Sequence, residues 1–215
     1  MTCTPPTAGA AAADAPTDAR DAAVEVRELR VAYGDTTVLH NIDLTVRAGE
    51  VMVIMGGSGS GKSTLLNALL GLLRPTAGEV RLLGQDITRM KERDLARLRQ
   101  RMGVAFQGGA LFSSMSVGEN IMLPLREHTR LDEETMRIMA RLKMEVVDLG
   151  GREALMPSEL SGGMVKRAAL ARAIIMDPQL LFCDEPSAGL DPVVAKQIDR
   201  LILDLRAAFD MTVIV

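Results

Sequence analysis

Apolar residues recur along the chain with two spacings, and the order of these spacings predicts the order of strands and helices. Alternation, or a short apolar run, predicts a strand, whereas apolar residues three and four positions apart predict a helix. We expect strands over 24–33, 37–46, 51–55, 78–83, 102–106, 180–183 and 212–215. We expect helices over 65–73, 90–101, 116–123, 133–147, 164–176 and 193–208. This order is typical of the α/β class, with a mostly parallel sheet flanked by helices and an antiparallel β portion near the N-terminus.

The pattern also divides the chain into parts. Residues 1–22 are rich in Ala, Thr, Pro and Asp without a sustained period, which predicts a disordered tail. We expect 23–215 to form one domain, in which helices concentrated between about 108 and 170 make an inserted helical subdomain. In the helix expected over 133–147, one side carries apolar residues that we expect to face the core, namely Met136, Met139, Leu142 and Val146.

Composition narrows the classes of function. The formal net charge of −3 gives no basic footprint for nucleic acid, so we expect no nucleic-acid partner. Two cysteines, Cys3 and Cys183, indicate no disulfide framework, which fits a reducing cytosol. No apolar run approaches the roughly 18 residues of a membrane span, and we expect no secretory signal. If the protein works at a membrane, it must dock onto an integral partner.

A glycine-rich segment carries the most specific chemistry. Residues 56–63 fit the phosphate-binding pattern G-x-x-x-x-G-K-[ST] between an expected strand and an expected helix, a context that disfavours a chance turn. Glycines let backbone N–H groups curl around phosphate oxygens, and the positive end of the helix adds to the field. Lys62 would reach the β- and γ-phosphates, and the Ser63 hydroxyl would ligate Mg²⁺. We expect a nucleoside triphosphate to contact Gly56, Gly57, Ser58, Gly59, Ser60, Gly61, Lys62, Ser63 and Thr64.

Two further segments gain meaning from this loop. The apolar run 180–183 ends in Asp184 and Glu185, and ligands bind at the ends of parallel strands. Asp184 would hold Mg²⁺, directly or through water, and Glu185 would orient or deprotonate the attacking water. Solvated acids at a strand exit are the alternative. The Ser-Gly-Gly segment 161–163 alone indicates only a helix start, but such a terminus could take a phosphate.

In this order, the motifs resemble those of the nucleotide-binding subunits of ATP-binding-cassette (ABC) transporters, from about residue 24 to the end. Residues 56–64 resemble the Walker A loop, 180–185 Walker B, 160–164 the family signature and 187–191 the D-loop. The resemblance implies a P-loop NTPase fold. It also implies nucleotide contacts for Ser161, Gly162, Gly163 and Asp191, stacking of Tyr33 on adenine, catalytic roles for Glu185, Gln107 and Lys62, and Mg²⁺ contacts for Ser63, Gln107 and Asp184.

The family resemblance implies an ATPase that binds ATP and Mg²⁺ within a membrane transport complex. Two copies would face each other head to tail and enclose two ATP molecules, with segment 161–163 of one copy against the phosphate loop of the other. Closing and reopening this homodimer would drive an integral-membrane permease. The subunit would therefore lie on the cytoplasmic face of the inner membrane, held there by the permease.

A narrower resemblance concerns the substrate. Residues 106–112, Asn120, 124–129 and Met164 look like those of ATPases in phospholipid-trafficking systems that work with MCE-domain lipid carriers. This implies ATP-driven phospholipid transport between membranes with an MCE-domain partner. One alternative is the ATPase of an importer for a polar solute such as an amino acid. Another is a non-transport ABC ATPase acting on DNA or ribosomes, which the short spacing between Lys62 and Ser161 and the single cassette disfavour.

The sequence departs from the family pattern at its C-terminal end. It stops at Val215, inside the expected strand before the family's switch loop, and neither His40 nor His128 occupies the switch-histidine position. We therefore expect a C-terminally truncated cassette that binds ATP but hydrolyses it poorly. We also expect segment 211–215 to have little to cover it.

Overall fold

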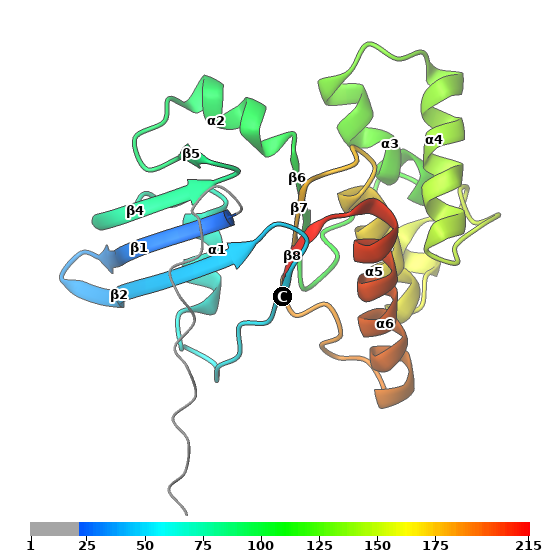
Figure 1. Cartoon of the computed structure of the whole chain (residues 1–215). Coiled ribbons are helices and arrows are strands. Elements are labelled where there is room, and N and C mark those ends of the chain that lie inside the picture. The colour runs from blue at the N-terminus through cyan, green and yellow to red at the C-terminus, as the bar shows by residue number, and fades with distance from the viewer. Residues whose placement is uncertain (1–21) are drawn as a thin grey trace, which may run out of the picture.

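The computed structural model describes residues 22–215, which form two four-stranded sheets with helices between and beside them (Figure 1). The first sheet is antiparallel, with the strand order β2-β1-β4-β5. Its strands are β1 (Ala22–Tyr33), β2 (Thr36–Arg47), β4 (Ala77–Leu82) and β5 (Gln85–Asp86). The tail expected over 1–22 lies outside the described residues except for Ala22, which belongs to β1 rather than to the tail.

The second sheet is parallel and forms the centre of the molecule. Its strand order is β3-β8-β7-β6, and every neighbouring pair in it is parallel. The strands are β3 (Val51–Met52), β8 (Thr212–Ile214), β7 (Leu180–Cys183) and β6 (Met102–Ala105). The prediction of a mostly parallel sheet with a separate antiparallel portion is therefore confirmed. The expectation that segment 211–215 is poorly covered is wrong, because β8 lies between β3 and β7 and Met211 and Val213 are fully buried.

The helices are distributed over both sides of the parallel sheet. They are α1 (Lys62–Leu69), α2 (Glu92–Arg99), α3 (Val117–His128), α4 (Glu133–Val146), the 3₁₀ turn η2 (Pro157–Glu159), α5 (Gly162–Ala173) and α6 (Pro192–Phe209). Figure 1 shows α3 and α4 together at the end of the molecule away from the antiparallel sheet, with α5 beside them. Both lie within the range expected for a helical subdomain.

Alternation along β7 separates two apolar cores. Leu180 and Phe182 face the cluster that contains α1 and the inner face of the antiparallel sheet. Leu181 and Cys183 face the opposite cluster, which contains residues of α3, α4, α5 and α6. Successive side chains of a strand point to opposite faces of a sheet, so four apolar residues in a row predict burial on both sides. The result is a layered α/β molecule in which β7 is buried along its whole length.

Two sequence expectations are wrong, one at the end of β3 and one within α4. The strand expected over 51–55 ends at Met52, and Val53 and Met55 are 54% and 87% exposed, because the chain turns there into the phosphate loop. In α4, Leu142 and Val146 are 61% and 43% exposed instead of facing the core. Three residues turn only about 300° around a helix, so Leu142, which lies two such steps after Met136, points in a different direction from Met136. The buried face instead carries Met136, Ala140, Lys143 and Met144.

Candidate nucleotide-binding site

The phosphate loop connects β3 to α1 and uses glycine where another residue would not fit. Gly61 is the N-cap of α1 and has φ of 93°, in the left-handed region that favours glycine. A Cβ at Gly61 would lie 2.7 Å from Cδ2 of Leu39. A Cβ at Gly56 would lie 2.5 Å from Oγ of Ser60. The loop therefore owes its close folding to its glycines, and its residues 56–60 are exposed.

The start of α1 is suited to an anion. Helices α3, α4, α5 and α6 each begin with a side-chain cap, whereas α1 has neither a side-chain cap nor an acidic residue in its first turn. Helix α2 also lacks a cap, but it carries Glu92 and Asp94 in its first turn. The first N–H groups of a helix have no partner within it, and the helix dipole favours negative charge there. The N–H groups of Lys62, Ser63 and Thr64 are thus placed for phosphate oxygens.

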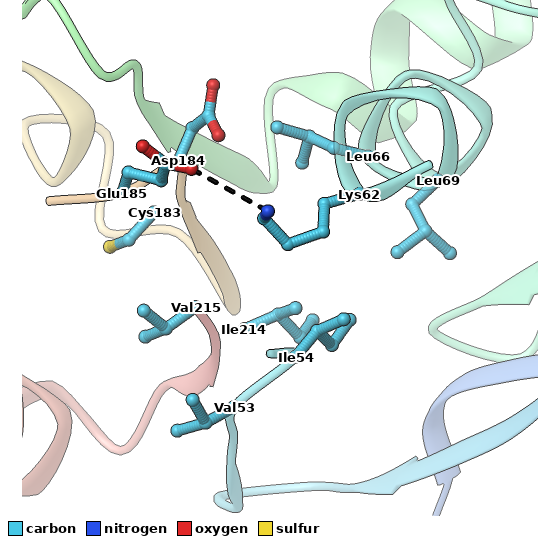
Figure 2. A pocket seen from close by; sticks show the side chains of 10 residues that line it. All are labelled: Val53, Ile54, Lys62, Leu66, Leu69, Cys183, Asp184, Glu185, Ile214 and Val215. Carbon is cyan, nitrogen blue, oxygen red and sulfur yellow. Dashed lines mark ion pairs between the residues drawn. The ribbon is translucent and has the colours of Figure 1, made fainter. Parts of the chain in front are cut away.

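Lys62 lies between this loop and the end of the central strand. Its Nζ donates hydrogen bonds to the carbonyl oxygens of Gly56 at 2.7 Å and Gly57 at 3.2 Å. The same atom forms an ion pair with Oε1 of Glu185 at 3.8 Å. Figure 2 shows this pair at one wall of a cavity of about 110 Å³, with Asp184 beside it and Val53, Ile54, Ile214 and Val215 across from it.

Strand register brings Gln107 and Glu185 together. Ala105 of β6 and Cys183 of β7 are paired, and Gln107 and Glu185 each lie two positions beyond this pair. Nε2 of Gln107 donates a hydrogen bond to Oε2 of Glu185 at 2.8 Å. Glu185 has φ of 45°, an uncommon conformation for a residue with a side chain. The turn at Glu185 directs its carboxylate to the edge where the phosphate loop lies.

The donor set fits a magnesium ion that arrives with a triphosphate. Ser63, Asp184 and Gln107 offer a hydroxyl, a carboxylate and an amide oxygen, which are the oxygen ligands that Mg²⁺ prefers. Within 22–215, no group of three or more His, Cys, Asp or Glu side chains could hold a metal by itself. Mg²⁺ is commonly held by one or two carboxylates together with substrate phosphates and water. These residues therefore fit a substrate-borne Mg²⁺, and their roles stay a prediction.

Other predicted site residues do not line this cavity. Tyr33 is exposed at the end of β1. Ser161 is the N-cap of α5, and the glycines after it face the start of α6: a Cβ at Gly163 would lie 2.8 Å from Cγ1 of Val194. Asp191 is the N-cap of α6, and its Oδ1 accepts hydrogen bonds from N–H of Val193 and Val194. The signature segment and Asp191 thus lie next to each other, apart from the cavity of Lys62 and Glu185.

Two buried residues, Lys166 and Asn120, and the partly buried Arg172 hold the segment 106–112 after β6, and the sequence analysis assigned none of them to the nucleotide site. Nζ of Lys166 donates to the carbonyl oxygens of Gln107 and, at 3.2 Å, of Glu185. Arg172 donates to the carbonyl oxygens of Gly109 and Ala110 at 2.8 and 2.7 Å. Asn120 is fully buried, and its Oδ1 accepts a hydrogen bond from N–H of Phe112 at the end of the segment. A signal existed: helix α5 is Ala-rich and buried on several sides, so its cations must face polar groups of the protein.

Burial governs the pKa values beside the site. Burial lowers the pKa of the Lys166 ammonium, and the nearby carboxylates of Asp184 and Glu185 oppose this by raising it. Burial also lowers the pKa of Arg172. Burial raises the pKa of the Cys183 thiol to about 12. The thiol that lines the cavity is therefore neutral near pH 7 and is not a nucleophile there.

These features define a P-loop nucleotide-binding cassette, and comparison with known proteins gives its family. The chain matches the family described as ABC transporter over residues 39–188. The chain belongs to this family, which confirms the resemblance found in the sequence. In 22–215, no helix has the length and apolar character needed to cross a membrane.

Two curated relatives show the range of transport systems to which the chain is similar. One, from Haemophilus influenzae, is named "Intermembrane phospholipid transport system ATP-binding protein MlaF" and is 48% identical over 192 residues, covering 89% of this chain and 73% of the relative. Another, from Mycobacterium leprae, is named "Probable ribonucleotide transport ATP-binding protein mkl" and is 45% identical over 193 residues. That match covers 90% of this chain but only 56% of the relative, so the chain spans little more than half of that protein.

Solved structures share the fold along nearly the whole described chain. A dimeric ATP-binding cassette in a post-hydrolysis state, bound to ADP and Pi, is 32% identical with a TM-score of 0.81. The match covers 89% of this chain and 86% of that chain. A cassette from Clostridium perfringens, part of an ABC transporter complex, is 31% identical with a TM-score of 0.83. That match covers 90% of this chain and 77% of the other chain.

Proposed function

We propose that this chain is the ATP-binding and ATP-hydrolysing subunit of an ABC transport complex that moves phospholipid between membranes. The proposal of ATP hydrolysis is supported by the contacts of Glu185 with Lys62 and with Gln107 at the carboxyl edge of the parallel sheet. The substrate part is supported by the name of the relative that is 48% identical and by the narrower sequence resemblance.

The phosphate loop and the start of α1 would bind the triphosphate. Backbone N–H groups at the start of α1 would donate to phosphate oxygens, and Lys62 would exchange its hydrogen bonds with Gly56 and Gly57 for bonds to the β- and γ-phosphates. Tyr33, exposed at the end of β1, would stack on the adenine ring. Thus the loop binds phosphates, while Tyr33 supplies the contact with the base.

Glu185 would orient and deprotonate the attacking water. Its Oε2 already accepts a hydrogen bond from Gln107, which fixes the direction of the carboxylate. Ser63, Asp184 and Gln107 would hold Mg²⁺, which would supply positive charge to offset the negative charge of the triphosphate. Lys62 adds positive charge where negative charge develops, so the barrier for phosphoryl transfer falls.

A second copy of the chain would complete the site. Ser161, Gly162 and Gly163 lie apart from the cavity of Lys62 within one chain, so they are free to face the nucleotide of a partner in a head-to-tail homodimer. Asp191 adjoins this segment through the start of α6. The similar solved cassette bound to ADP and Pi is dimeric, which supports this arrangement.

The complex would contain an integral-membrane permease and an MCE-domain lipid carrier, with this subunit on the cytoplasmic face of the inner membrane. A polar-solute transporter is the second candidate, because the Mycobacterium leprae relative is named for ribonucleotide transport. Both candidates share the ATP chemistry and differ in what the partner subunits carry.

Purification of the complex from native membranes, followed by mass spectrometry of proteins and lipids, separates these candidates. We expect an integral permease, an MCE-domain protein and bound phospholipid. A solute-binding protein without phospholipid would overturn the substrate and leave the ATPase assignment intact. Release of phosphate from ATP by the same preparation tests the catalytic part, and a Glu185→Gln complex is its matched control.

A further inference from the structure

Lys166 occupies an unusual place for a lysine. It is the fifth residue of α5 and is only 8% exposed. Burial of an ammonium group costs free energy unless polar groups of the protein replace its water. A cation so near the positive end of the helix dipole also gains nothing from the helix itself. Contacts outside α5 must therefore hold Lys166 in place.

Those contacts reach the two residues at the centre of the site. Nζ of Lys166 donates to the backbone carbonyl oxygen of Gln107 and to that of Glu185. The side chains of the same two residues are joined by their own hydrogen bond. Lys166 thus closes a ring in which backbone and side chains of Gln107 and Glu185 are both fixed.

The unusual backbone conformation of Glu185 needs contacts that hold it, and the hydrogen bond from Lys166 is one of them. Its φ of 45° is sparsely populated for a residue with a Cβ, and such conformations persist when the surroundings hold them. The Glu185 carbonyl accepts from Lys166 and also from N–H of Ala188 at 3.1 Å. Together these bonds fix the peptide that aims the Glu185 carboxylate toward Lys62.

Arg172 lies on the same helix as Lys166 but has different hydrogen-bond partners. It also donates to the segment after β6, at the carbonyl oxygens of Gly109 and Ala110. Among the hydrogen bonds of residues 22–215, those of Arg172 stay within that segment, whereas Lys166 also reaches Glu185. The link between α5 and the catalytic carboxylate therefore belongs to Lys166.

We propose that Lys166 is a positioning residue for ATP hydrolysis: through the two backbone carbonyls it holds Gln107 and Glu185 in the geometry that activates water. This inference rests on the proposed ATPase function. Among the hydrogen bonds within the described residues 22–215, none joins Lys166 to the phosphate loop, so its role is in turnover and not in ATP affinity. Because Ser161 is the N-cap of α5, Lys166 also ties the signature segment to the catalytic carboxylate of its own chain.

The test compares Lys166→Met with Lys166→Arg in the complete native complex, with Lys196→Met on the exposed surface of α6 as the matched control. We expect Lys166→Met to lower kcat roughly 10- to 100-fold, since small misplacements of catalytic groups have effects of this size. The Kd of Mg²⁺-free ATP should stay close to that of the unmodified protein. Lys166→Arg, which keeps a donor, should restore most of the rate, and Lys196→Met should have no effect.

The outcomes separate the two proposals. If the unmodified complex hydrolyses ATP and Lys166→Met matches its kcat, the positioning role is overturned while the proposed function stands. Equal losses in kcat and ATP affinity, without rescue by arginine, would also overturn it, because they indicate a general structural role. If the unmodified complex does not hydrolyse ATP, both proposals fail. Should Lys166→Met not fold, Lys166→Gln, with the same expected split between kcat and Kd, takes its place.

Discussion

Gln107 donates a hydrogen bond from Nε2 to Oε2 of Glu185 at 2.8 Å, although the residues lie 78 positions apart. The other oxygen of the same carboxylate faces Lys62 at 3.8 Å. Each oxygen of Glu185 therefore has its own partner, one from the end of β6 and one from the start of α1. This arrangement restricts rotation of the carboxylate and keeps it at the phosphate-binding edge of the sheet.

Replacement of Lys62 by alanine removes the cation from the phosphate loop. We expect ATP affinity to fall roughly 30- to 150-fold, because a hydrogen bond between charged groups contributes about 2–3 kcal/mol. Titration with a fluorescent ATP analogue measures the loss. Lys196→Ala, which removes an exposed lysine of α6, is the control and should bind normally. Unchanged affinity of the Lys62→Ala protein would contradict the assignment of the loop.

Replacement of Gly61 by alanine tests the geometry of the loop. The left-handed φ of 93° and a contact of 2.7 Å with Leu39 both oppose a Cβ. We expect the free energy of unfolding to fall by about 1–3 kcal/mol, as measured by urea denaturation. Gly57→Ala is the matched control: no heavy atom lies within 4 Å of its Cβ, so the change should stay within about 0.5 kcal/mol. Equal stability of the two variants would refute the steric account.

Replacement of Asn120 by alanine tests the anchor of the segment after β6. Its Nδ2 donates to the carbonyl oxygens of Phe112, Met115 and Ser116 at 3.0, 3.1 and 2.9 Å, and its Oδ1 accepts from N–H of Phe112 at 2.7 Å. Loss of these bonds removes the side-chain partner of the Phe112 N–H and of the Met115 carbonyl oxygen and leaves a gap where a fully buried side chain stood, so it should cost about 2–4 kcal/mol of stability. Denaturation with urea measures this, and Gln197→Ala on the exposed face of α6 should be neutral. A neutral Asn120→Ala would show that water satisfies those groups.

The buried thiol of Cys183 makes stability depend on alkaline pH. Burial raises its pKa from 9.0 to about 12, so the thiol stays neutral in the folded protein after the unfolded chain has ionised. The stabilising contribution is complete below about pH 9 and is lost as the pH rises toward 12. At pH 10 we expect a loss of roughly 1 kcal/mol relative to a Cys183→Ala protein, measured by urea denaturation at pH 8 and pH 10. Parallel pH curves for the two proteins would exclude this linkage.

Periodicity and motif were sufficient to predict the fold class and the location of the phosphate loop. Four consecutive apolar residues from Leu180 to Cys183 predicted a strand buried on both faces, and β7 is that strand. Acids after such a strand predicted a site at its carboxyl end; Asp184 and Glu185 line a cavity together with Lys62, and their roles stay a prediction. These predictions depend on local patterns, which a sequence displays directly.

Contacts between distant segments could not be predicted in the same way. Lys166 bonds Gln107 across 59 positions, and its neighbours on α5 show only an Ala-rich helix. The prediction of the buried face of α4 was also wrong. Apolar residues spaced three apart and four apart both indicate a helix, but only an alternation of the two spacings stays on one face of it. Side-chain roles of this kind require the register of sheets and the rotation of helices.

The most direct test of the central claim replaces Glu185 by glutamine in the complete complex and measures phosphate release and ATP binding together. Glutamine keeps the size of the side chain and its place beside Gln107 but cannot take a proton from water. We predict that phosphate release falls at least about 100-fold, as for loss of a general base, while ATP remains bound. Continued phosphate release at the original rate would contradict the role of Glu185 and the site built around it.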